Sequence, residues 1–170
     1  MRTSPTAWTK AEADHASPMA LWFPVGIRFS CHPRTFVPAE PDAIELAVAV
    51  AAAADDKKAA DLLLLEVADV LAVVDVFLLA TATSDRQLKA IADAVEERGR
   101  ALGRRPQQRE GRAESGWLLL DFGDVVVHLF SEEQREFYSL ERLWADVPRI
   151  DTTTGERLPP VTSLSSADEA

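Results

Sequence analysis

The chain has 170 residues, which is enough for one domain of ordinary size. Its net charge of −10 argues against binding to bare nucleic acid, because phosphate contacts need clustered Lys and Arg. The single cysteine, Cys31, excludes an internal disulfide, and no apolar run reaches the ~18 residues that a membrane span requires.

The first 40 residues differ from the rest of the chain. They contain five of the ten prolines, two of the four tryptophans and the only cysteine, and they lack a sustained apolar period. We expect residues 1–40 to form a disordered N-terminal extension, because such a segment cannot bury enough apolar surface to fold. Two alternatives remain open. The natural chain could begin at Met19 or later, or Trp22 and Phe23 could bind a partner.

A helix and two strands are predicted next along the chain. Pro41 and Asp42 are typical of a first helical turn, and the helical spacing ends near residues 55–58. Residues 62–67 form a continuous apolar run, which predicts a strand covered on both faces. Residues 76–82 predict a second strand.

A capping box, Ser84 with Gln87, predicts the start of a second helix, which Gly103 and Pro106 end. Residues 107–115 are polar and are expected to form a loop. A hairpin follows, with apolar strands at 117–121 and 124–130 around Phe122-Gly123, where glycine allows the positive φ of a tight turn.

The two faces of the predicted hairpin have different compositions. A two-residue turn would pair Asp121 with Asp124, Leu119 with Val126, and Trp117 with His128. The opposite face is entirely apolar and is assigned to the core. The first face mixes Trp, His and carboxylates, which is typical of a contact surface rather than a core. A bulged turn would shift the pairing but not the alternation within each strand.

Ser131 and Gln134 form a second capping box and predict a final helix. Phe137, Leu140 and Trp144 lie on one stripe of that helix, and Trp144 can be assigned equally to the core or to a contact. Residues 149–170 are rich in Thr, Ser, Pro and acids and are expected to be a disordered acidic tail. The predicted fold class is therefore α/β, a small mixed sheet with element order α-β-β-α-β-β-α.

No arrangement of residues points to catalysis. Asp121-Phe122-Gly123 matches the metal-binding tripeptide of kinases, but the chain lacks the rest of the kinase motifs, so we interpret it as a turn. His15, His32 and His128 lie far apart and show no metal-ligand spacing. We therefore expect a protein that is not an enzyme and has no cofactor and no metal.

Residues 42–148 carry a family resemblance, in which each motif alone is weak and the order and spacing are specific. The matching motifs are Lys57-Lys58-Ala59, Asp75-Val76-Phe77, Thr83-Ser84-Asp85-Arg86-Gln87, Glu110-Gly111, Trp117, Asp121-Phe122-Gly123-Asp124, Val127-His128, Phe137-Tyr138 and Leu140-Glu141-Arg142-Leu143-Trp144. This pattern resembles the ribosomal silencing factor (Iojap-related) family. Thr83 departs from it, because many members have Asn there. The resemblance implies a ribosomal silencing factor domain over 41–148.

The resemblance also implies a fold similar to nucleotidyltransferases, without their catalytic motif. In those enzymes a glycine-rich loop holds phosphates at the strand-to-helix junction. The corresponding residues 81–85 contain no glycine. A Mg²⁺-dependent nucleotidyltransferase is therefore retained only as an alternative.

The function implied by the resemblance is regulation of translation. Members bind ribosomal protein fourteen of the large subunit and sterically block joining with the small subunit when nutrients are limited. A cytoplasmic location, a homodimer in the free state, and little or no direct binding to nucleic acid or membrane are expected. A role in large-subunit assembly is the main alternative. The residues predicted to contact the partner are Trp117, Leu119, Asp121, Asp124, His128, Tyr138, Glu141 and Trp144.

Overall fold

The structure is a computed structural model that describes residues 36–160. The predictions for residues 1–35 and 161–170 lie outside the described residues. The elements in chain order are α1 (Pro41–Asp56), β1 (Ala60–Glu66), β2 (Val76–Ala82), α2 (Asp85–Ala101), β3 (Gln108–Arg112), the 3-10 turn η1 (Ala113–Ser115), β4 (Trp117–Asp121), β5 (Val125–Ser131), α3 (Glu132–Tyr138), α4 (Leu140–Leu143), β6 (Arg149–Ile150) and β7 (Arg157–Leu158).

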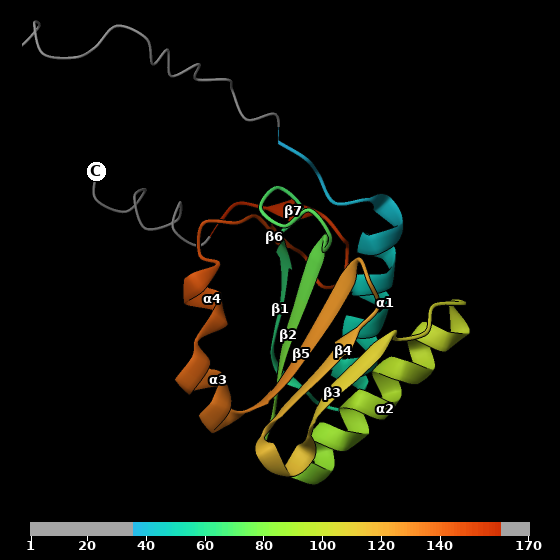
Figure 1. Cartoon of the computed structure of the whole chain (residues 1–170), viewed down its shortest axis with the longest axis vertical. Helices are drawn as coiled ribbons and strands as arrows, with labels where there is room; N and C mark the ends of the chain where they lie inside the picture. The colour runs from blue at the N-terminus through green and yellow to red at the C-terminus, as the bar shows by residue number, and fades with distance from the viewer. Residues whose placement is uncertain (1–35, 161–170) are drawn as a thin grey trace, which may run out of the picture. The chain divides into compact units, whose positions relative to one another are not determined.

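The described strands form one seven-stranded sheet in the order β3-β4-β5-β2-β1-β6-β7 (Figure 1). Strands β2 and β5 pair in parallel at its centre, and the other neighbouring strands pair antiparallel. Helices α1 and α2 cover one face, whereas α3 and α4 lie on the other (Figure 1). The α/β class and the mixed sheet are thus confirmed, whereas the similarity to nucleotidyltransferases stays a prediction.

The main hydrophobic core lies between the sheet and the helices α1 and α2. Helix α1 buries Leu46 and Val50, and α2 buries Leu88, Ile91 and Val95. The strands contribute the apolar face that the hairpin alternation assigned to the core, namely Leu118, Leu120, Val125 and Val127. A smaller core lies on the other face around Leu65, Leu79 and Phe130.

Both predicted capping boxes begin helices. The Ser84 Oγ accepts a hydrogen bond from the Gln87 N–H at 3.3 Å, and the Gln87 Oε1 accepts from the Thr83 N–H at 2.8 Å. Ser131 caps α3 by accepting from the Gln134 N–H at 3.3 Å. These bonds satisfy donors that a helix start otherwise leaves free.

The hairpin register differs from the two-residue turn. Three residues, 122–124, separate β4 from β5, and the Phe122 N–H bonds to the Val125 carbonyl at 2.9 Å. Asp121 consequently pairs with Val126, Leu119 with His128, and Trp117 with Phe130. Gly123 has the expected positive φ, 97°. Because the pairing shifts by two residues, the paired strand residues stay on their predicted faces, whereas Asp124 lies in the turn and leaves the face predicted for it.

The prediction of a polar loop at 107–115 is wrong. Residues Gln108–Arg112 form β3, the edge strand paired with β4, and all five residues are exposed. An edge strand with both sides in solvent buries no apolar face, so its sequence has no alternation to detect. Its charged side chains are typical of protected sheet edges.

The final helix is also not continuous. It is broken at Ser139, which has φ 44° and separates α3 from α4. Because of this break, Phe137, Leu140 and Trp144 do not lie on one helical stripe as predicted. Phe137 is 77% exposed, whereas Leu140 and Trp144 pack against the smaller core.

The predicted domain limits need correction at both ends. Residues 149–160 are not a disordered tail, because β6 pairs with β1 and β7 pairs with β6. The Arg157 guanidinium bonds the buried Glu66 carboxylate at 2.8 and 2.9 Å. Ala39, predicted to lie in the extension, is buried and donates its N–H to Glu66 at 2.7 Å. The ordered domain thus includes residues on both sides of 41–148.

No helix within residues 36–160 combines the length and apolar character needed to cross a membrane.

Candidate protein-interaction surface

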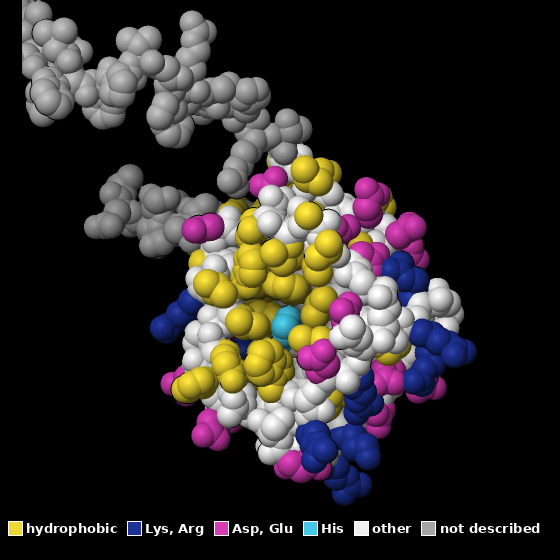
Figure 2. Space-filling model, in the orientation of Figure 1, with side chains coloured by type: hydrophobic (Ala, Val, Ile, Leu, Met, Phe, Trp, Pro, Cys, Tyr) yellow, Lys and Arg dark blue, Asp and Glu magenta, His cyan; other side chains and the backbone are white. Residues whose placement is uncertain are grey.

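The sheet face opposite α1 and α2 carries a row of aromatic side chains from three strands and the α3–α4 segment. We call this surface the aromatic face and define it by Phe77, Trp117, His128, Phe130, Tyr138 and Trp144. Strand alternation places Phe77 of β2, Trp117 of β4, and His128 and Phe130 of β5 on it. Figure 2 shows apolar side chains gathered across this side of the molecule, with a histidine among them.

The rings of the aromatic face touch in a continuous series. Trp117 lies 4.8 Å from Tyr138 and 5.3 Å from Phe130 between ring centroids. Phe77 contacts His128 edge-on at 5.2 Å and Trp144 at 5.6 Å. These are the separations at which aromatic pairs attract beyond simple burial. The rings of the aromatic face therefore pack against one another, although Trp117, Phe77 and Trp144 remain only half-buried.

His128 is the most unusual residue of this face. It is only 8% exposed, and within residues 36–160 neither ring nitrogen has a hydrogen-bond partner. Burial, with a smaller contribution from the positive charge of Arg135, lowers the pKa of His128 to about 4. The imidazole is thus neutral near pH 7 and behaves as an aromatic packing residue. The buried Trp117 Nε1 likewise has no partner in the described part of the chain.

Arg135 fixes α3 against the sheet. Its guanidinium bonds the Glu141 carboxylate at 3.1 and 3.2 Å and the Asp61 carbonyl at 3.2 Å. It also reaches the Thr81 hydroxyl at 3.5 Å. Glu141, predicted as a partner contact, is therefore engaged within the protein as the bridge between α3 and α4.

The two hairpin carboxylates have separate structural roles. The Asp121 Oδ1 accepts the Gly123 N–H at 2.7 Å, which stabilises the turn. Asp124 forms an ion pair with Arg104, which lies in the segment after α2. Asp121 shares the face of Trp117, whereas Asp124 is turned toward the α2 side, so the structure does not place the two acids together.

Several exposed apolar side chains surround the aromatic face on the described surface. Val73 follows β1, Phe137 lies on α3 and Leu143 lies on α4, and they are 81%, 77% and 73% exposed. Large exposed apolar areas of this kind commonly mark interaction sites. The surface lies beside a depression of about 270 Å³ between the hairpin and α3, lined in part by Trp117, Leu119 and Tyr138.

Seven of the eight predicted contact residues lie on this side of the sheet, with Asp124 as the exception, and none of them is shown to touch a partner. The predicted contact residues do not include Phe77, Phe130 and Leu143, which also lie on this side. The alternation of strand 76–82 would have placed Phe77 on the face of Leu79. Phe130 follows from the alternation of β5, but the exposure of Leu143 depends on the break at Ser139.

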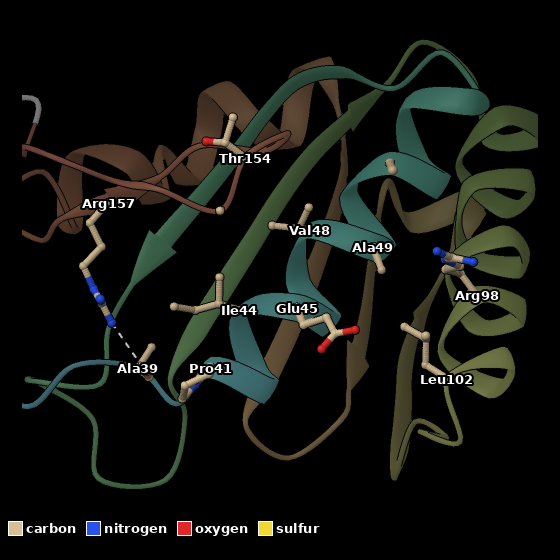
Figure 3. Close-up of a pocket in the computed structure, with 12 residues that line it drawn as sticks. Ala39, Pro41, Ile44, Glu45, Val48, Ala49, Arg98, Leu102, Thr154 and Arg157 are labelled. Carbon is tan, nitrogen blue, oxygen red and sulfur yellow. Dashed lines mark hydrogen bonds between the residues drawn. The ribbon is translucent and has the colours of Figure 1, made fainter.

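A separate groove of about 660 Å³ lies beside α1 (Figure 3). Ile44 and Val48 form its apolar floor, and Glu45 and Arg98 lie on one wall. On the other side, the Arg157 guanidinium donates to the Ala39 carbonyl at 3.2 Å. Within residues 36–160 there is no group of three or more His, Cys, Asp or Glu that could hold a metal ion.

The fold and this face define a small α/β domain whose sheet carries a partly exposed row of aromatic side chains. The model of the family described as "Ribosomal silencing factor during starvation" matches residues 40–169. The chain belongs to this family.

Named relatives agree with this assignment. The chain is 42% identical over 105 residues to ribosomal silencing factor RsfS of Bacillus subtilis, covering 62% of this chain and 89% of that protein. It is 36% identical over 121 residues to the chloroplastic protein Iojap of Zea mays, covering 70% and 53%. It is 33% identical over 91 residues to mitochondrial assembly of ribosomal large subunit protein 1 of Mus musculus, covering 52% and 40%.

Solved structures show the same fold. A protein from Bacillus halodurans superposes with a TM-score of 0.55 at 34% identity, covering 66% of this chain and 99% of that one. A protein from Chromobacterium violaceum gives a TM-score of 0.57 at 32% identity, covering 59% and 83%.

Proposed function

We propose that this protein binds the large ribosomal subunit through ribosomal protein fourteen and blocks joining with the small subunit. The observation that carries the proposal is an aromatic face bordered by the exposed side chains of Phe137, Tyr138 and Leu143, in a chain of the ribosomal silencing factor family. Trp117 and Tyr138 have the character of interface anchors, because large aromatic side chains dominate the binding energy of many interfaces. The proposed contact covers Trp117, Leu119 and Asp121, with Tyr138 and Trp144 beside them. His128, which was predicted as a contact, is buried and packs beneath these residues.

Charge complementarity supports a basic protein partner. The net charge of −10 favours encounter with the generally basic ribosomal proteins. Asp121 lies at the end of β4 on the aromatic face, and Glu110 lies opposite Leu119 in the register. These acids are expected to act mainly on the association rate, and the isolated protein is expected to bind free RNA weakly.

The proposed mechanism is steric and requires no chemical step. A protein bound on the surface that meets the small subunit prevents joining in proportion to its occupancy. Translation in the cytoplasm would then fall as the bound fraction rises, which suits a response to nutrient limitation.

In the free state, we propose that the exposed apolar side chains are covered by a second copy. Phe137 and Leu143 protrude from α3 and α4 and would be costly to leave in water. A homodimer of this kind would compete with subunit binding, since both would use the same side of the sheet.

A second candidate function is assistance in assembly of the large subunit. The mouse relative favours it, since that protein is named for mitochondrial assembly of the large ribosomal subunit. Assembly and silencing are compatible, because both require binding to the same particle.

Co-sedimentation tests the proposed function directly. The purified protein is mixed with large subunits, with small subunits and with joined ribosomes, and each mixture is separated on a sucrose gradient. We expect co-migration with large subunits and loss of joined ribosomes when the protein is added before the small subunit. Equal binding to both subunits would contradict the proposal. Mg²⁺-dependent nucleotide turnover by the purified domain would instead favour the transferase alternative.

A further inference from the structure

Charge is distributed unevenly over this acidic protein. Residues 85–112, which contain α2 and β3, carry eight Lys and Arg against five Asp and Glu, a net charge of +3. The rest of the chain therefore carries a net charge of −13, since the total is −10. In Figure 2, Lys and Arg side chains gather along the side of the molecule where α2 and β3 lie. The total charge thus does not describe the electrostatics of this side.

A depression of about 690 Å³ lies within this basic side. Lys89 of α2 and Arg109 and Arg112 of β3 line it, and Glu114 is the acid in its lining. Arg109 is paired, with its Nη1 at 2.6 Å from Glu96 and 3.3 Å from Asp93. Lys89 and Arg112 are exposed and have no ion pair in the described part of the chain. Two unpaired cations beside a single acid, Glu114, therefore point to an anionic ligand.

The basic depression adjoins the aromatic face. Gly111 and Ser115 line both this depression and the one beside Trp117 and Tyr138. Arg112 also pairs directly with Trp117 in the sheet register. When a partner occupies the aromatic face, the basic depression therefore lies against the part of the partner particle next to that contact.

That neighbouring surface is identified by its chemistry. A basic ribosomal protein would be repelled by Lys89 and Arg112, so these residues do not suit the same partner as the aromatic face. RNA phosphates lie beside proteins throughout a ribosomal subunit and suit both cations. The guanidinium of Arg112 can bind phosphate oxygens in a bidentate manner, while the Lys89 ammonium acts as a point charge.

We propose that Lys89 and Arg112 form a phosphate-binding site that contacts the RNA backbone of the large subunit when the aromatic face is docked. This inference rests on the proposed binding to the large subunit. Two phosphate contacts are too few to hold free RNA against a net charge of −10. Once the aromatic face is bound, the second contact is intramolecular and benefits from a high effective concentration.

The test compares two double variants with the same loss of charge. Lys89→Gln with Arg112→Gln removes the proposed contacts. Lys57→Gln with Lys58→Asn removes two cations at the end of α1, outside residues 85–112, and Asn tolerates the φ of 62° at position 58. Affinity of the full chain for purified large subunits is measured between 50 and 200 mM salt, and circular dichroism melting verifies the fold of each variant.

Loss of two phosphate contacts should lower the slope of log affinity against log salt by about 1.4 to 1.8. Across the salt range, the parent should lose about tenfold more affinity than Lys89→Gln with Arg112→Gln. The control should keep the parental slope. A parental slope in the first variant, or an equal decrease in the control, would overturn the inference. Absence of binding by the parent at every salt concentration would instead refute the proposed function, and the inference with it.

Discussion

Trp117 and Leu118 are neighbours in sequence and lie on opposite faces of β4. Trp117 is half-buried among Phe130 and Tyr138, whereas Leu118 is 1% exposed in the main core. Trp117→Ala should therefore weaken large-subunit binding by about 2–4 kcal/mol, roughly a 30- to 1,000-fold loss of affinity. Leu118→Ala should instead lower the melting temperature, because it leaves a cavity costing about 2–5 kcal/mol. Gradient binding and thermal melting separate the two effects.

The comparison is made on folded variants. Because Trp117 stacks on Phe130, its removal should cost some stability, which the melting curve measures. If Trp117→Ala binds large subunits as the parent does, the contact lies elsewhere on the described surface, most directly around Tyr138 and Trp144.

His128 should make stability depend on pH. Its pKa is about 4 in the folded protein and about 6.5 in the unfolded chain, so the unfolded chain binds more protons between these values. The free energy of unfolding should therefore fall as pH drops from 6.5 toward 4. Between pH 7 and pH 5 the contribution of His128 is about 2 kcal/mol.

Denaturant unfolding of the parent and of His128→Phe at both pH values measures this contribution. Phe retains an aromatic ring beside Phe77 and does not titrate, and the carboxylates should contribute equally to both proteins. The parent should lose about 2 kcal/mol more than the variant on acidification. Equal losses would show that His128 does not carry the effect.

At the scale of elements, the β6–β7 hairpin should be needed for stability. Arg157 of β7 is paired with Glu66, whose side chain is fully buried in β1, and the Pro148 carbonyl accepts the Glu66 N–H at 2.8 Å. Truncation after residue 148 removes Ile150 from the core and leaves the Glu66 carboxylate without Arg157. Because an unpaired buried charge is costly, cooperative melting should be lost or shifted far downward.

Truncation after residue 160 provides the matched control, since it keeps both strands. Its melting temperature should be close to that of the full chain. A finer test is Arg157→Leu, which should cost about 1–3 kcal/mol in denaturant unfolding. Equal stability of the two truncated chains would show that β6 and β7 contribute little.

The elements that the sequence predicted are those with internal patterning or caps. Helix α2 has a cap at Ser84 and a buried stripe of Leu88, Ile91 and Val95, so its position could be deduced. Strand β3 is fully exposed, and β6 and β7 have two residues each. The positions of these strands depend on pairing with strands that are distant in sequence, and no local sequence pattern predicts such pairing.

The candidate site shows the same division. The side of the sheet on which Trp117, Leu119 and His128 lie followed from alternation, which survived the error in register. The engagement of Glu141 with Arg135 and of Asp124 with Arg104 depends on tertiary contacts. Sequence alone therefore identified the face but not which of its charges are free.

At the scale of the whole molecule, the protruding apolar residues should control self-association. Leu143→Glu places a charge on α4 at a position that is 73% exposed, so the fold should be unaffected while a homodimer through this side is weakened. Sedimentation velocity should then show a lower average mass than for the parent at the same concentration. Leu102→Glu, 39% exposed after α2, makes the same charge change on the opposite side and should not alter the mass. A parental mass for Leu143→Glu would place the dimer contact elsewhere.

The strand order also constrains when the protein can finish folding during its own synthesis. The central parallel pair joins β2 to β5, and β1, the first strand made, receives β6 near the end of the described chain. Contacts this distant in sequence form slowly and only after both partners have been translated. A nascent chain that stops before residue 150 would lack one neighbour of β1 and leave that edge open. A protein proposed to act on ribosomes would thus complete the sheet around β1 only after residue 150 has been translated.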